Sequence, residues 1–173
     1  MCRRGCGEES FLCTVYGYLL ALPHAVCWQH FKEERQGFLD WLAMNHIDGV
    51  IFLSGDRHRT ELLKIDRPGA YPLHVLTCSP LTSQPRKAGE ESRHPQRVEG
   101  TLAEQRNFCT LDFTGEENDR RLMLRSFGSS GRKLREVKVA ADSLKTRQEQ
   151  LSWNRMSGGG TASPGARGSV PAR

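Results

Sequence analysis

The stretch GVIFLSGDRHRTELL, Gly49 to Leu63, changes abruptly from apolar to polar side chains. Val50 to Leu53 form a continuous apolar run, which is typical of a β-strand covered on both faces in a layered α/β fold. Polar residues follow at once, and Gly55 allows the chain to turn sharply there. Because ligands of α/β proteins gather beyond the carboxyl ends of strands, this turn is the first candidate for a functional site.

Two residues of this turn carry groups that bind metals. Asp56 offers a hard oxygen ligand and His58 an imidazole nitrogen, so together they are candidate ligands of one metal ion or of two adjacent ions. Arg57 is a weaker candidate for binding the phosphate of a substrate, and a side chain that points to solvent is the alternative. As a bare pattern Gly-Asp-x-His occurs by chance, and a local hydrogen bond is its commoner explanation.

The flanking segments predict an α/β layer. Apolar residues recur at three- and four-residue steps from Phe31 to His46, which predicts a helix that ends before Gly49. A second strand is expected from Tyr71 to Thr77, because Pro80 cannot continue it. Residues 83–102 are polar and predict a long surface loop.

The C-terminal part predicts an antiparallel meander. Strands are expected over residues 107–113, 121–127 and 134–139, joined by turns that contain glycine. Residues 140–153 are expected to form a closing helix. Residues 151–173, rich in Gly and without an apolar pattern after the first few positions, are expected to be a disordered tail.

Charge and cysteine content narrow the class of protein. Of the net charge of +5 on 173 residues, +3 comes from arginines after Leu151, and no basic stripe interleaved with aromatic residues is present. We therefore do not expect a nucleic-acid partner. The six cysteines form no C-x-x-C pair, so reduced thiols are expected, with Cys78 and Cys109 half-buried.

The apolar run from Phe11 to Leu22 follows two arginines and is similar to the hydrophobic region of a secretory signal. Glu8 and Glu9 interrupt that pattern, no small-x-small cleavage site follows, and the run is too short to cross a bilayer. A leader or packed peripheral segment over residues 1–26 is favoured, in a cytoplasmic protein. Secretion is the alternative if residues 11–22 are a signal, and attachment to a membrane is not expected.

Several segments resemble, in the same order, the C-terminal half of the alkaline phosphatase D family, the PhoD-like metallophosphatases. They are WQHF (28–31), EER (33–35), FLDWL (38–42), GVIFLSGDRH (49–58), EL (61–62), YPLHVLTCSPLTS (71–83) and RNFCTLDF (106–113). The resemblance covers about residues 27–144. It assigns residues 27–150 to the C-terminal part of such a domain, between the leader and the tail.

The resemblance implies one half of a four-layer α/β/β/α metallophosphoesterase sandwich. It also implies hydrolysis of phosphomonoesters or phosphodiesters at a cluster of iron and calcium, whose charge stabilises the phosphoryl oxygens and activates water. In that family Gly-Asp-x-His is the last metal-binding element. Asp56 would therefore bind one metal and His58 its neighbour.

The sequence also departs from the family. The family's earlier ligand elements have no counterpart, since residues 1–26 contain no Asp or Asn and one histidine, His24. Cys109 stands where family members usually carry glycine. Two protein ligands hold a metal weakly, so we expect a truncated phosphatase fragment that is inactive or poor by itself, and no catalytic residue is assigned. A non-catalytic remnant whose exposed sheet docks on a protein partner is the alternative.

Overall fold

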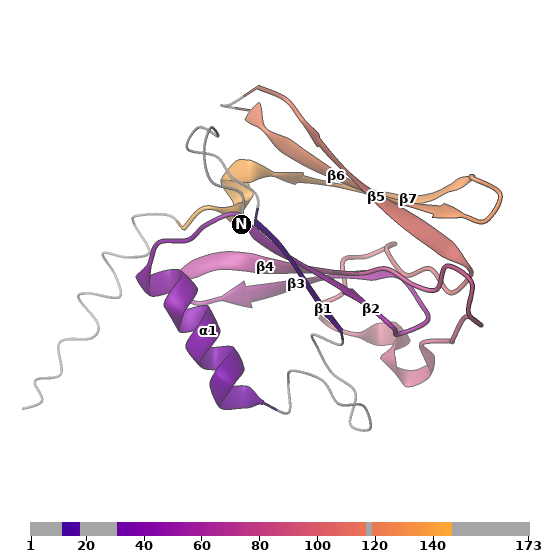
Figure 1. Ribbon diagram of the computed structural model, residues 1–173, viewed down its shortest axis with the longest axis horizontal. Helices are drawn as coiled ribbons and strands as arrows, with labels where there is room; N and C mark the ends of the chain where they lie inside the picture. Colours follow the sequence, from indigo (N-terminus) through magenta and orange to yellow (C-terminus); the bar gives the residue numbers. More distant parts are fainter. Residues whose placement is uncertain (1–11, 18–30, 117–118, 147–173) are drawn as a thin grey trace, which may run out of the picture.

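The computed structural model describes residues 31–116 and 119–146 and the backbone of residues 12–17 (Figure 1). The chain is a mixed α/β protein with two small sheets and one α-helix in these ranges. The elements are β1 (Leu12–Gly17), α1 (Lys32–Met44), β2 (Val50–Gly55), β3 (Glu61–Arg67), β4 (Ala70–Thr77), the 3₁₀ turn η2 (Gly89–Arg93), β5 (Asn107–Thr114), β6 (Arg121–Gly128), β7 (Lys133–Ala140) and the 3₁₀ turn η4 (Ala141–Leu144).

The first sheet has the strand order β1-β2-β4-β3 and the second the order β5-β6-β7. In the first sheet β2 runs parallel to both β1 and β4, whereas β3 is antiparallel to β4. The carboxyl ends of β2 and β4 therefore meet at one edge, where Cys78 N donates a hydrogen bond of 2.9 Å to Ser54 O. That edge holds the turn with Asp56 and His58.

The first sheet lies between α1 and the second sheet (Figure 1). Phe52 of β2 packs edge-on against Phe38 of α1, with ring centroids 6.4 Å apart. Leu124 of β6 and Val139 of β7 belong to the same buried cluster as Phe52 and Ile51. Both faces of β2 are thus covered, which explains why its apolar residues do not alternate with polar ones.

Most of the predicted elements are confirmed. The helix expected from Phe31 to His46 is α1, the strands expected at Val50 and Tyr71 are β2 and β4, and the predicted meander is β5-β6-β7. Residues 83–102 form no strand, but backbone bonds from Lys64 to Gln96 and from Val98 to Leu62 attach this segment to the outer edge of β3. The loop thereby covers an edge that would otherwise be free to pair with another chain.

Two predictions did not hold in the described residues. Where residues 140–146 were expected to begin a closing helix, the structure has the short turn η4, and Lys145 has an extended backbone; residues 147–153 lie outside the described residues. The thiols of Cys78 and Cys109 are not reduced but form a disulfide, since the packing of the two sheets brings residues 31 apart together. Disulfides persist mainly in oxidising compartments.

The predicted tail, residues 151–173, lies outside the described residues, and so does the predicted leader except for Leu12–Gly17. That segment, part of the apolar run, pairs with β2 along its whole length. Among the residues that the structure describes, no helix is long and apolar enough to cross a membrane.

The disulfide predicts a measurable loss of stability on reduction. Because it closes a loop of 31 residues, its removal should lower the free energy of unfolding by about 3 kcal/mol. Reducing agent should lower the Tm of the wild type, whereas the Cys78→Ser/Cys109→Ser double variant should start lower and not respond. Equal Tm values for the two proteins under oxidising conditions would contradict the presence of the bond.

Candidate metal and anion site

The turn after β2 has an unusual backbone. Asp56 and His58 both adopt the left-handed conformation, with φ of 61° and 57°. Asp and His tolerate this region better than most residues that carry a Cβ, but each residue held in this conformation still costs free energy. Exposure alternates along the turn: Asp56 is exposed and His58 half-buried, whereas Arg57 and Arg59 are buried. The backbone thus separates the two candidate metal ligands from two inward-facing arginines.

The His58 ring is held by the long loop. Its Nδ1 lies 2.6 Å from the backbone oxygen of Gln84, and a carbonyl oxygen only accepts hydrogen bonds. The proton of neutral His58 therefore sits on Nδ1, which leaves the lone pair on Nε2. A second backbone bond, from Arg86 N to His58 O at 2.8 Å, fastens the same residue to the same loop. Metal-binding histidines are commonly oriented by this kind of bond from the other ring nitrogen.

Arg57 does not point to solvent, so that alternative is wrong. Its side chain is 3% exposed and donates to Glu61 Oε1 at 2.6 Å and to Glu91. Arg59 also contacts both carboxylates, and Arg97 donates to Glu61 Oε2 at 2.8 Å. Three guanidinium groups from the turn and from the long loop therefore surround two carboxylates.

The Glu61 carboxylate is the most buried group of this cluster, with no exposed side-chain surface. Burial alone would raise the pKa of Glu61, but the charges of Arg57, Arg97 and Arg59 together with the hydrogen bond from Arg97 outweigh it, and the pKa is lowered. The nearby His94 has a lowered pKa, chiefly because of its partial burial; the Glu61 charge opposes this shift, and the charges of Arg97 and Arg57 add to it. Glu61 therefore stays ionised over the physiological pH range.

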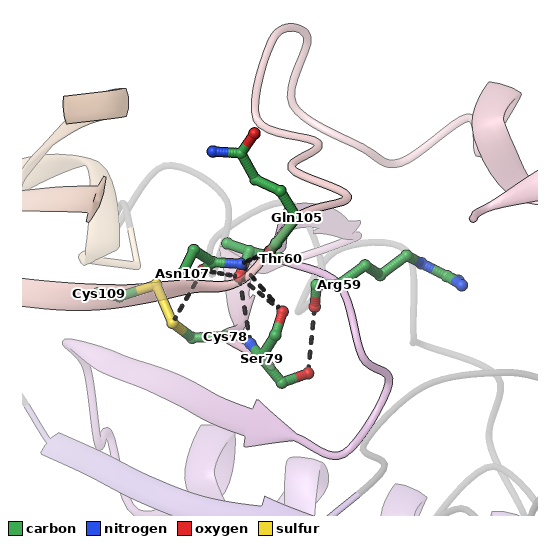
Figure 2. Close-up of a disulfide and its surroundings, with 7 residues drawn as sticks. All are labelled: Arg59, Thr60, Cys78, Ser79, Gln105, Asn107 and Cys109. Carbon is green, nitrogen blue, oxygen red and sulfur yellow. Dashed lines mark hydrogen bonds between the residues drawn. A yellow bond between two sulfur atoms is a disulfide. The ribbon is translucent and has the colours of Figure 1, made fainter. Parts of the chain in front are cut away.

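A second network fixes the other end of the turn (Figure 2). Buried Asn107 accepts a hydrogen bond from the Thr60 hydroxyl at 2.6 Å and donates to Ser79 O at 3.1 Å and Gln105 O at 2.7 Å. Ser79 N donates to the Thr60 hydroxyl oxygen at 3.2 Å. Thr60, the loop after β4 and the start of β5 are thereby joined beside the disulfide.

Ser79 has a structural role in the loop after β4. Its hydroxyl donates to Arg59 O at 3.3 Å, and its peptide bond to Pro80 is cis. His74 is buried in β4, and burial lowers its pKa. Neither residue joins the candidate metal ligands.

Asp56 and His58 form a small set of potential metal donors. Asp56 and His58 are suitable in type, and the orientation of His58 suits binding through Nε2. Among residues 31–116 and 119–146, however, no group of three or more His, Cys, Asp or Glu side chains is arranged to hold a metal ion. The turn thus presents two donors, and no reaction step through a metal is derived from it.

The sequence did not reveal the carboxylates that hold the arginines. Glu61 opens β3, a strand that the sequence analysis did not predict, and Glu91 lies in η2 of the long loop. The one signal in the sequence was the closeness of opposite charges, since Arg57 and Arg59 lie within four residues of Glu61.

Comparison with known proteins adds no relative. No protein-family model matches the chain, and no curated protein is significantly similar to it.

The lowered pKa of Glu61 predicts how stability depends on pH. The stabilisation from its ionised form is complete above the ordinary pKa of 4.5 and is lost as the pH falls towards the lower pKa of the folded state. Glu61→Gln should cost about 3 kcal/mol near neutral pH, because the arginines lose a partner. Urea unfolding should show this difference shrinking below about pH 4.5.

The exposed neighbour variant Glu90→Gln serves as the control and should follow the wild type at every pH. A Glu61→Gln difference that stays constant into strong acid would show that ionised Glu61 does not stabilise the fold.

The Asn107 network predicts a large effect of one amide. Asn107→Ala should lower the free energy of unfolding by about 2–3 kcal/mol, because it leaves buried donors and acceptors unpaired. Asn45→Ala, which removes an exposed amide bonded to Trp41 O at 2.8 Å, should cost less than about 1 kcal/mol. Chemical unfolding measures both, and equal losses would refute the special role of Asn107.

Proposed function

We propose that the chain is part of a metal-dependent phosphoester hydrolase of the PhoD-like type, in which Asp56 and His58 are two of the metal ligands. The observation that carries this proposal is the hydrogen bond between His58 Nδ1 and Gln84 O, which leaves the lone pair of the neutral ring on Nε2. The left-handed backbone at both ligands also supports it, because such conformations concentrate at functional sites.

The position of the turn supports the same proposal. It follows a strand that is parallel to both neighbours, at the sheet edge where α/β proteins bind ligands. The three layers formed by α1 and the two sheets are compatible with one part of a metallophosphoesterase sandwich. Iron and calcium are the metals that the family resemblance implies. When bound, such metals polarise the phosphate and activate water.

Within this proposal the described residues have limited roles. Asp56 supplies a carboxylate and His58 an imidazole oriented by the long loop, while Arg57 serves the fold through Glu61 and Glu91. Two protein ligands leave a metal mostly bound to water and therefore weakly held. We propose that the chain by itself hydrolyses phosphoesters poorly or not at all, and that activity requires further ligands.

A non-catalytic, protein-binding role is the second candidate. It is favoured by α1, on which Trp41 is 48% and Met44 72% exposed. Exposed large apolar side chains are more common at interaction sites than elsewhere on a surface. This role requires neither Asp56 nor His58, so metal binding separates the two candidates.

The metal ligands are testable by NMR with Mn²⁺, whose unpaired electrons broaden nearby signals. At roughly millimolar Mn²⁺ the amide signals around Asp56 and His58 should broaden first. Asp56→Asn and His58→Gln should each abolish this effect, whereas the control His94→Gln should retain it. Broadening that is unchanged in His58→Gln, or that begins elsewhere on the chain, would contradict the assignment.

A parallel assay addresses turnover. With iron and calcium added, hydrolysis of p-nitrophenyl phosphate by the chain should not exceed that of the metals alone. Turnover that disappears in His58→Gln would disprove the expected inactivity and at the same time support the ligand assignment.

A further inference from the structure

The arginine cluster beneath the turn has an arrangement that an ordinary structural ion pair does not need. Arg57 and Arg59 both direct Nη2 to one oxygen, Oε2 of Glu91. In addition, Arg57 Nε is buried and has no hydrogen-bond partner among the residues that the structure describes. A buried donor left unpaired is costly. Glu91 therefore satisfies the two arginines incompletely.

The two carboxylates of the cluster are not equivalent. Glu61 is fully buried and holds Arg57, Arg59 and Arg97 from below, whereas the Glu91 side chain is 21% exposed. Glu91 belongs to η2, a turn of five residues without a buried member. Glu61 is thus the buried partner of the arginines, and Glu91 is their partly exposed partner.

The charges of the cluster indicate what could replace Glu91. Three arginines and two carboxylates sum to +1, and without Glu91 the same groups sum to +2. A phosphate dianion would balance the second value. Its several oxygens would also give each guanidinium group, and the unpaired Arg57 Nε, an acceptor of its own.

We propose that Arg57 and Arg59 form a binding site for a phosphate dianion, free or as a monoester, which Glu91 occupies from within the chain. Binding requires η2 to move outward, which exchanges one carboxylate for the ligand without breaking the contacts to Glu61. The site consists of the buried arginines of the turn and does not include Asp56 or His58. It needs no metal, and it stands or falls separately from the proposed hydrolase function.

Binding of an anion at this site would also change the hydrogen bonds that hold the His58 ring. The segment that carries Glu91 begins with the residues that hold His58, through Gln84 O and Arg86 N. Outward movement of Glu91 would loosen those bonds, so that the anion would act on the orientation of the imidazole. The proposed ligand is therefore a regulator of the turn as well as an occupant of the cluster.

The proposal is tested by removing the charge of Glu91, which occupies the site within the chain. Glu91→Gln keeps the size of the side chain and removes its charge, so inorganic phosphate should bind about tenfold more tightly than to the wild type. At a phosphate concentration ten times the dissociation constant, the Tm of Glu91→Gln should rise by about 4 °C over chloride of equal ionic strength. The control Glu90→Gln, on the same turn, should behave as the wild type.

Two further experiments identify the preferred ligand and provide a second variant in case Glu91→Gln does not fold. ³¹P NMR titration of phenyl phosphate measures the monoester directly, and tighter binding than inorganic phosphate would identify an ester as the ligand. Should Glu91→Gln unfold, Glu91→Asp keeps the charge on a shorter side chain and should show a smaller gain in affinity. If neither variant gains phosphate affinity, or if Arg59→Gln in the Glu91→Gln background does not remove it, the proposal is wrong.

Discussion

A fully buried carboxylate, Glu61, is the constraint on which the arrangement of the turn depends. An ionised group without exposed surface is tolerated only when opposite charges and hydrogen bonds replace its water. Arg57 and Arg59 of the turn and Arg97 of the long loop provide them. Because these arginines come from separate segments, one buried charge fixes the turn after β2 and the loop along β3 relative to each other.

The surroundings of Asp56 and His58 depend on these buried ion pairs. Arg57 and Arg59 are buried by their contacts to the carboxylates, whereas Asp56 is exposed and His58 half-buried. The loop attached by Arg97 then places Gln84 O against the His58 ring. The disulfide and the Asn107 network hold the adjacent loop after β4. The same turn thus carries both the arginines of the structural ion pairs and the candidate metal ligands.

The sequence predicted those parts of the fold that local patterns determine. The helix α1 follows from its periodic apolar residues, and β2 from an unbroken apolar run that has no surface face. The strand β3 was missed because it begins with the charged residue Glu61, whose partners become evident only in three dimensions. The disulfide was missed because Cys78 and Cys109 are joined by the packing of two sheets and not by a motif. For the same reason the inward direction of Arg57 could not be predicted, since Glu91 lies 34 residues away.

The orientation of the His58 ring is where the account can be tested most directly. Nitrogen-15 NMR of the imidazole, recorded at a pH where the ring is neutral, distinguishes a proton on Nδ1 from one on Nε2. The Nδ1–H form is expected, because Gln84 O accepts that proton and the lone pair of the ring is then on Nε2. A ring that carries its proton on Nε2, or one that averages between the two forms, would contradict it.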